Sequence, residues 1–309
     1  MTLFEKKGDG VLRQRNPVKY AFIKRHRHRY SIGLMCRLLG VSRNGYYHYL
    51  THGKRKEDKK LVLSIKAVFR ASRQTYGTRR IREALRREYG LIVSRRRIGR
   101  IMQKEGLVAK RKDRKRIKTT DSNHNLPISP NLLERRFIGL KPNQVYVGDI
   151  TYIKTKEGWL YLAVVIDLYA RVVVGQAIAD HMRKELVIKA LKHAHARRGG
   201  FEPKAIFHSD RGSQYASFEF RKTLEAFDMR QSMSAKGNCY DNAACETFFA
   251  TLKTELPGST KHLTKKEAIK AIENYITFYN IKRLHSYNGY LSPLEAEMVW
   301  WRNRLKVAA

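Results

Sequence analysis

Three stretches of sequence decide the fold: "QVYVGDITYI" (144–153), "WLYLAVVIDLY" (159–169) and "RVVVGQAI" (171–178). The first alternates in polarity, and the other two are apolar runs rich in β-branched and aromatic residues, so all three predict strands. Only "KTKEG" (154–158) and "DLYA" (167–170) connect them. Connections this short predict an antiparallel meander.

The sequence after the meander alternates between helical and extended patterns. A helix is expected over 184–198, a strand over 204–210, a helix over 217–227, an extended segment over 230–234 and a helix over 240–253. This order indicates a mixed five-stranded α/β sheet flanked by helices. Residues 265–286 predict one further amphipathic helix.

A helix-turn-helix outline lies near the start of the sequence. Ile32, Met35, Leu38 and Leu39 recur at helical spacing, and Ser42 follows a glycine turn as the expected N-cap of the next helix. Such an outline is typical of DNA-binding modules. An ordinary helical hairpin is the alternative.

A second outline, over about 61–107, repeats the first. Ser94 is the expected cap of its second helix. The apolar positions expected to face inward are Ile81, Leu85, Tyr89, Ile98, Ile101 and Met102. Arginines cluster at the start of the second helix: Arg95, Arg96, Arg97 and Arg100. Groove-reading helices place base and phosphate contacts there, so we expect these arginines to bind DNA.

The charge of the chain is extreme and uneven. It has 64 basic and 27 acidic residues, a net charge of +37. Residues 1–118 carry 36 basic and 8 acidic residues, whereas 119–309 carry 28 and 19. A first part this basic favours a polyanionic partner, and nucleic acid is the usual one. A ribosomal-type protein and general cationic solubility are the alternatives.

Other sequence features restrict the class of protein. Cys36, Cys239 and Cys245 form no CxxC pair, which argues against a disulfide framework and a zinc knuckle. The longest apolar run, residues 160–166, is far shorter than the ~18 residues of a membrane span. The first ten residues lack the apolar segment of a signal peptide. We therefore expect a reduced, soluble, cytosolic protein with no membrane partner.

Three acidic residues stand out by position. Asp149 interrupts the first strand, Asp210 ends a later strand before a glycine turn, and Glu246 lies on a helix among apolar neighbours. Singly, each has an ordinary explanation: an edge-strand charge, a turn residue, or half of a salt bridge with Lys253 or Arg211. Jointly, Asp149 and Asp210 can occupy adjacent strands, with Glu246 on a helix packed over them.

Three clustered carboxylates repel one another unless cations bind them, and hard oxygen ligands suit Mg²⁺ or Mn²⁺. Two such ions about 3.5–4 Å apart activate a water or hydroxyl and stabilise the leaving oxygen of a phosphodiester. This chemistry requires neither a histidine nor a serine nucleophile. The sequence therefore predicts a site for divalent ions that acts on phosphodiesters.

The spacing and context of these acids resemble a known family. Sixty residues lie between Asp149 and Asp210, and thirty-five between Asp210 and Glu246. This resembles the DDE triad of the retroviral-integrase catalytic core, and nearly the whole chain resembles OrfB-type transposases of bacterial insertion sequences. The stretches that carry the resemblance are "YSIGLMCRLLGVSRNGYY" (30–47), "PNQVYVGDITYI" (142–153), "LYLAVVIDLYARVVVG" (160–175), "HSDRGSQY" (208–215), "SAKGNCYDNAACETFFATLK" (234–253) and "YNIKRLHSYNGYLSPLEAE" (279–297).

The resemblance implies a DNA transposase. Such an enzyme binds the terminal inverted repeats of its element, cleaves DNA strands and transfers the freed 3′-hydroxyl into DNA by a divalent-metal DDE mechanism. Asp149, Asp210 and Glu246 match the metal-binding catalytic acids of the family. Mg²⁺ is the implied cofactor, with two ions and Mn²⁺ as a substitute.

Two further residues of the Glu246 helix match the family motif. Lys253 follows Glu246 by two helical turns, so it shares that face and is expected to reach a DNA phosphate. Asn242 is expected on the same face, orienting Glu246 or contacting DNA, with helix N-capping as the alternative. Two positions depart from the family: Tyr146 stands where many relatives have tryptophan, and Thr247 replaces a frequent serine.

The predicted fold class is multidomain, with all-α helix-turn-helix units before an α/β ribonuclease-H-like core and a helical C-terminal tail. The expected ranges are 1–58 and 59–109 for the two DNA-binding units, 110–140 for a basic linker, 141–257 for the core and 258–309 for the tail.

Double-stranded DNA is the expected partner, and symmetric element ends imply a homo-oligomer, a dimer or larger. An upstream reading-frame product supplies a helix-turn-helix and a leucine zipper in many family members, and no zipper heptad is visible here. The expected location is the bacterial cytoplasm, at the nucleoid. Two rival functions are a nuclease or resolvase that cuts without joining, and a DNA-binding regulator with a degenerate core. The presence of all three acids argues against the regulator.

Overall fold

A computed structural model describes residues 11–51, 58–110, 126–134, 141–235, 242–256 and 260–308. The chain divides into two compact units, Met1–Val62 and Leu63–Ala309. Among the described residues, no helix combines the length and the apolar character that crossing a bilayer requires.

The described residues of the first unit include the short helices α2 (Asn16–His26), α3 (Ile32–Leu38) and α4 (Arg43–Thr51). The Ser42 hydroxyl accepts a hydrogen bond from the Gly45 amide at 3.0 Å, which confirms the predicted cap. The core is made by Ile23, Met35, Cys36, Leu39 and Tyr46. Leu38, one of the four apolar residues at helical spacing, is 51% exposed, whereas Cys36 and Leu39 are buried.

The second helix-turn-helix outline is formed by α5 (Lys59–Ala71), α6 (Thr78–Tyr89) and α7 (Arg95–Lys104). The Ser94 hydroxyl caps α7 by accepting a hydrogen bond from the Arg97 amide at 3.3 Å, as predicted. Gly90 ends α6 in the left-handed region, with a φ of 64°. Of the six predicted inward residues, Tyr89 is the exception at 43% exposure, since it is the last residue of α6.

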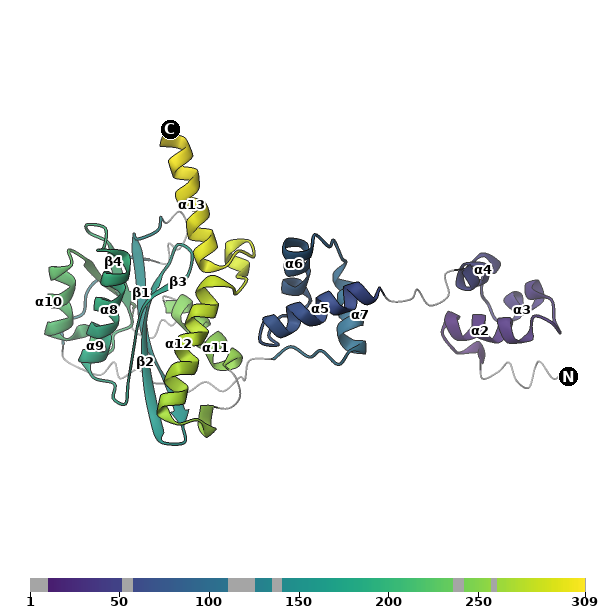
Figure 1. Ribbon diagram of the computed structural model, residues 1–309, viewed down its shortest axis with the longest axis horizontal. Coiled ribbons are helices and arrows are strands. Elements are labelled where there is room, and N and C mark those ends of the chain that lie inside the picture. The colour runs from purple at the N-terminus through teal and green to yellow at the C-terminus, as the bar shows by residue number, and fades with distance from the viewer. Residues whose placement is uncertain are drawn as a thin grey trace. The chain divides into compact units, whose positions relative to one another are not determined.

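Five strands form one sheet: β1 (Val145–Thr155), β2 (Gly158–Asp167), β3 (Val172–Ala179), β4 (Ile206–Ser209) and β5 (Arg230–Met233). Their order is β3-β2-β1-β4-β5 (Figure 1). β1, β2 and β3 pair antiparallel, whereas β1 pairs parallel with β4 and β4 with β5. The predicted meander and mixed sheet are therefore confirmed. β1 is the central strand, not an edge.

Helices cover both faces of the sheet (Figure 1). α8 (Lys184–Arg198), α9 (Ser213–Ala216) and α10 (Phe218–Ala226) enclose one apolar core with Tyr146 and Val165. α11 (Ala243–Glu255) and α12 (Lys265–Ile281) enclose the other with Val147 and Val164. Successive residues of β1 and β2 thus project alternately into the two cores, as the two-residue repeat of a strand requires.

The tail of the chain is helical, as expected. Two single turns, η2 (Thr260–His262) and η3 (Ser286–Asn288), precede and follow α12, and α13 (Pro293–Ala308) comes last. α12 ends at Ile281, five residues before the end of the predicted helix.

Buried ion pairs tie the outer helices to the core. The Arg198 guanidinium donates to Asp167 at 2.8 Å and to both carboxylate oxygens of Glu297 at 2.5 and 3.0 Å. Arg283 makes two hydrogen bonds of 2.8 Å to Glu255, near the end of α11. Buried carboxylates are tolerated here because each is paired and hydrogen-bonded.

The second helix-turn-helix outline contacts the core within the Leu63–Ala309 unit. The Leu284 amide donates to the buried Tyr76 hydroxyl at 2.7 Å, and Arg87 donates to Glu295 at 2.8 Å. Arg80 lies over the Tyr76 ring and 3.9 Å from Glu255.

Close packing of α8 on β3 requires glycine at position 175. A Cβ atom on Gly175 would lie 2.3 Å from the Ala190 carbonyl oxygen and 2.7 Å from the Ala194 Cβ. We expect Gly175→Ala to lower the free energy of unfolding by about 1–3 kcal/mol, measured by urea denaturation. Gly99→Ala in α7 is the matched control, because its Cβ would meet only an ordinary contact at 3.6 Å. That substitution should raise stability by about 0.5–1 kcal/mol, and equal effects would contradict the packing argument.

Candidate active site

The pairing of β1 with β4 brings Asp149 next to Asp210. Val145 pairs with Ile206, and Val147 with His208, so partners differ by 61 positions. The same offset joins Asp149 to Asp210, which directly follows β4. Asp149, within β1, and Asp210, just after β4, therefore lie at the same level of two neighbouring parallel strands, as the sequence predicted for adjacent strands.

Asp149 is half-buried and lies in an unfavourable electrostatic environment. One carboxylate oxygen accepts a hydrogen bond from the amide of Ile150 at 2.7 Å. Burial raises the pKa of Asp149 well above its usual range, and the negative charges of Asp210 and Glu246 raise it further, against the lowering effect of Lys253. The fold thus brings negative charges together without full compensation.

Glu246 reaches this site from α11. The helix buries Cys245, Phe248 and Leu252 against the sheet, and Glu246 is exposed on another face. The acid is therefore not buried among its apolar neighbours, which removes the desolvation cost that such a position would carry.

Asn242 is buried at the start of α11, whereas a residue that contacts DNA is expected on an exposed face of that helix. It is only 6% exposed, and its side-chain amide donates to the carbonyl oxygen of Gly148 at 3.2 Å. It occupies the N-cap position of α11 but makes no side-chain capping bond. Its observed role is to tie the start of α11 to the backbone just before Asp149.

Lys253 lies between the acids and an aromatic ring. Its ammonium nitrogen is 4.4 Å from the ring centre of Tyr152. Burial lowers the pKa of Lys253, and the carboxylate of Asp149 opposes that shift. A cation held near an acid and a ring keeps its charge available for a phosphate.

Two buried residues near the acids were not singled out from the sequence. Burial and the charges of Asp149 and Asp210 raise the pKa of Tyr215 well above its usual range. Burial and the same acids raise the pKa of Cys245. Both groups stay neutral and line the site as packing residues. Tyr215 lies in the motif "HSDRGSQY", the only signal that pointed to it.

Within the described part of the chain, no three His, Cys, Asp or Glu side chains are arranged closely enough to hold a metal ion as they stand. The donor set nevertheless fits a divalent cation in its chemistry. Its side-chain oxygens are carboxylates, which Mg²⁺ prefers. Burial raises the pKa of Asp149, and the charges of Asp210 and Glu246 raise it further, so a cation beside these acids would offset part of the cost of their charges. Asp149, Asp210 and Glu246 are the residues that could hold such an ion.

The predicted DNA-contacting arginines lie on α7, at its N-terminal end. Arg95, Arg96 and Arg100 are exposed and Arg97 is half-buried. None of the four has an acidic partner among the described ion pairs.

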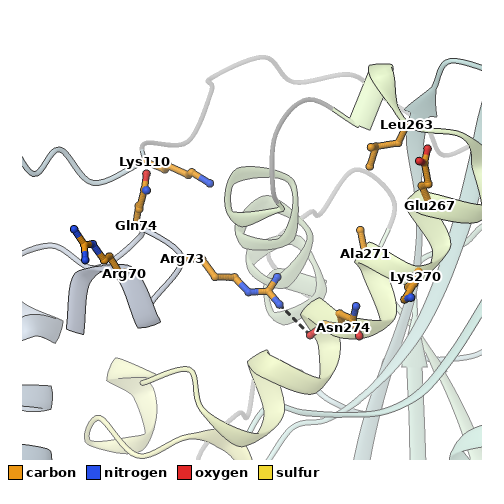
Figure 2. Close-up of a pocket in the computed structure, with 9 residues that line it drawn as sticks. All are labelled: Arg70, Arg73, Gln74, Lys110, Leu263, Glu267, Lys270, Ala271 and Asn274. Atoms are coloured by element: carbon orange, nitrogen blue, oxygen red, sulfur yellow. Dashed lines mark hydrogen bonds between the residues drawn. The ribbon is translucent and has the colours of Figure 1, made fainter. Parts of the chain in front are cut away.

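A basic cleft of about 660 Å³ lies between the end of α5 and α12 (Figure 2). Four basic side chains line it: Arg70, Arg73, Lys110 and Lys270. Arg73 donates to the Asn274 carbonyl oxygen at 3.2 Å, as Figure 2 shows. The carboxylate of Glu267, which also lines the cleft, caps α12 by accepting a hydrogen bond from the Thr264 amide at 2.8 Å. The cleft does not contain the three acids.

Family models match the chain in three places. Models described as integrase core domain match residues 139–239 and 227–293, and one described as HTH-like domain matches residues 55–115.

Two relatives are similar over most of the chain. An insertion element IS600 uncharacterized 31 kDa protein of Shigella sonnei is 46% identical over 264 residues, 84% of this chain and 96% of the relative. The transposase InsF for insertion sequence IS3A of Escherichia coli (strain K12) is 40% identical over 288 residues, 91% of this chain and 98% of the relative.

The chain is an insertion-sequence transposase with an integrase core, an enzyme class that cleaves DNA and transfers strands. Within that class it belongs to the IS3 family, together with the InsF transposases. The resemblance seen in the sequence is therefore confirmed.

Solved structures of retroviral integrases are more distant. The simian T-cell lymphotropic virus intasome in complex with PP2A regulatory subunit B56 gamma has a TM-score of 0.44 and 18% identity, over 66% of this chain and 67% of that one. The HTLV-2 integrase catalytic core domain in complex with magnesium has a TM-score of 0.40 and 19% identity, over 52% of this chain and 99% of that one.

Neutralising one acid should stabilise the fold. Since Asp149 lies among like charges, we expect Asp149→Asn to raise the Tm of the chelator-treated protein by about 2–4 °C, the shift for about 1 kcal/mol in a chain of this size. Asp228→Asn is the control, because Asp228 is exposed and paired with Lys204 at 2.5 Å. A Tm for Asp149→Asn that is unchanged or lower, measured by differential scanning fluorimetry, would contradict the clustering.

Proposed function

We propose that Asp149, Asp210 and Glu246 form the DDE triad of this transposase, and that they hold two Mg²⁺ ions, for which Mn²⁺ substitutes. The observation that supports the proposal is the register offset between β1 and β4, which relates Asp149, within β1, to Asp210, the residue after β4. The negative charge of Glu246 raises the pKa of Asp149, which supports Glu246 as the third member of the triad.

When bound, the ions would supply Lewis-acid activation of a water or 3′-hydroxyl and stabilisation of the leaving oxygen. The chain's own residues supply the positioning. Lys253 offers an ammonium group beside Asp149 that can hold a phosphate of the cleaved strand. Asn242 fixes the backbone at Gly148, and so the position from which Asp149 projects. Direct DNA contact by Asn242 is not part of the proposal, because the residue is buried.

The DNA substrate is proposed to be the terminal inverted repeats of the element. The exposed arginines of α7, Arg95, Arg96 and Arg100, together with half-buried Arg97, would contact bases and phosphates, as helix N-termini of such modules do. The basic cleft would extend the contact to the phosphate backbone, since its cations outnumber its one acid. The domain ranges given above remain predictions, as does the role of residues 110–140 as a linker.

The assembly and location are also part of the proposal. Two element ends must be joined in one reaction, so we infer a homo-oligomer, a dimer or larger. Cooperation with an upstream reading-frame product remains open to test. The substrate would place the protein at the nucleoid in the bacterial cytoplasm.

The first test addresses the triad. Asp210→Asn and Glu246→Gln should each reduce joining of a labelled element-end oligonucleotide in Mg²⁺ by at least about a thousandfold, because each removes a charge needed in the transition state. Binding of the same oligonucleotide should stay unchanged.

Glu273→Gln is the matched control, an exposed acid on α12 outside the site. Joining near the wild-type level by either triad variant would refute the assignment. Cleavage without a joined product in the wild type would instead support a nuclease.

The second test addresses the arginines. Replacing Arg95, Arg96 and Arg100 together with alanine should weaken binding to element-end DNA and lower the slope of log K against log salt by about two to three. The measurement is fluorescence anisotropy at several salt concentrations. Replacing the three exposed residues Arg302, Arg304 and Lys306 of α13 is the charge-matched control. An identical change in both triple variants would mean that α7 has no special role.

A further inference from the structure

Two aromatic rings, half-buried Tyr152 on β1 and exposed Trp159 on β2, lie on one face of the β1–β2 hairpin, and β1 also carries Asp149. Lys154 is directly opposite Trp159, and Tyr152 is directly opposite Tyr161, so all four side chains project from the same side of the sheet. The rings of Tyr152 and Trp159 pack edge to face, with centroids 5.1 Å apart and an interplanar angle of 76°.

Both rings are at least partly accessible. Trp159 is 43% exposed and Tyr152 is half-buried. β1 pairs with β4 only as far as Val147, so the later part of β1 lies beyond β4. Large aromatic rings left open beside polar groups mark binding surfaces more often than folding requirements.

Two lysines flank the rings. The Lys154 ammonium lies 5.6 Å from the Trp159 ring centre, and the Lys253 ammonium lies 4.4 Å from the Tyr152 ring centre. The sequence of groups is therefore cation, ring, ring, cation. Surfaces that bind single-stranded nucleic acid combine the same two kinds of group: rings stack on bases, and cations hold the backbone.

The surface is close to the candidate active site. Tyr152 follows Asp149 by three residues, about 10 Å along an extended strand, and this odd offset directs the two side chains to opposite faces of β1. Lys154, the strand partner of Trp159, follows Asp149 by five residues, roughly 17 Å along the strand. Lys253 connects the two regions, since it contacts the Tyr152 ring and lies within electrostatic reach of Asp149. At about 3.4 Å per base along one strand, the distance corresponds to roughly three to five nucleotides.

We propose that Tyr152 and Trp159, flanked by Lys154 and Lys253, form a stacking platform for unpaired bases of the DNA end whose phosphodiester lies at Asp149. The inference rests on the proposed function, because that function brings a DNA strand to the acids. Strand cleavage at a duplex end exposes one strand, and separated bases present free faces that a paired duplex does not.

The chemistry favours unpaired DNA over other occupants. A protein partner would be expected to cover an apolar patch, whereas here Lys154 lies beside the Trp159 ring and Lys253 beside the Tyr152 ring. A fully paired duplex would engage the lysines through its phosphates but would leave the ring faces without a partner. A purely structural ring pair would affect stability and not DNA preference, so the two explanations give different results.

The experiment compares two DNAs of identical length with the full-length protein in a chelating buffer, where no strand is cut. One is a fully paired duplex, and the other has its last four base pairs mismatched, with 2-aminopurine among the unpaired bases. Trp159→Ala should weaken binding of the mismatched end on the order of tenfold, and binding of the paired duplex by less than about twofold. Quenching of 2-aminopurine by the wild type should be lost.

Two further variants keep the test decisive. Trp159→Leu keeps apolar bulk but removes the ring face, so it should behave like Trp159→Ala even if the alanine variant folds poorly. Trp301→Ala is the matched control, because Trp301 is 38% exposed on α13 and lies outside the hairpin. It should leave both affinities unchanged.

Equal loss on both DNAs, or no loss for a folded Trp159→Leu protein, would overturn the platform. These outcomes are separate from failure of the proposed triad, because binding is measured without catalysis. If Asp210→Asn retained joining activity while Trp159→Leu lost mismatched-end binding, the platform would stand and the triad would fall.

Discussion

The parallel pairing of β1 with β4 is the constraint on which the candidate site depends. The pairing register is fixed by apolar side chains on both faces, since a shift of one residue would turn every side chain to the opposite face. With the offset set by Val145 and Val147, Asp149 and Asp210 have no freedom to separate. Hydrophobic packing therefore brings two like charges together, although their repulsion opposes it.

α11 combines a packing function with a chemical one. Its buried residues Cys245, Phe248 and Leu252 fix the helix on the sheet, and this orientation leaves Glu246 and Lys253 accessible. The two ends of the helix are held differently. Asn242 bonds to the backbone of β1, and Glu255 joins the buried network of Arg283 and Tyr275. The helix is thus anchored on both sides of its exposed acid.

Sequence patterns predict the helices and strands of this chain well, but they predict the surroundings of individual side chains less well. The strands, their antiparallel order and the helix over 184–198 follow from local periodicity, so they could be read directly. The prediction that Tyr89 faces inward is wrong, because periodicity gives the apolar face of a helix but not where its contacts end. The sequence leaves three roles open for Asn242 (orienting Glu246, contacting DNA or capping the helix), because its observed partner, Gly148, is 94 residues away and leaves no local signal. For Trp159, the sequence pattern predicts a place in a strand but not that its ring is exposed.

The sequence by itself determined the class of fold, the family, the basic character of the first part of the chain and the three acids with their spacing. These features are local, or repeat with a period that reflects the geometry of helices and strands. Only the tertiary structure decided that the acids lie together, that Asn242 faces inward and that two rings beside the acids remain open. Those facts depend on contacts between distant segments, because packing of the two cores fixes which side of each strand and helix is left exposed.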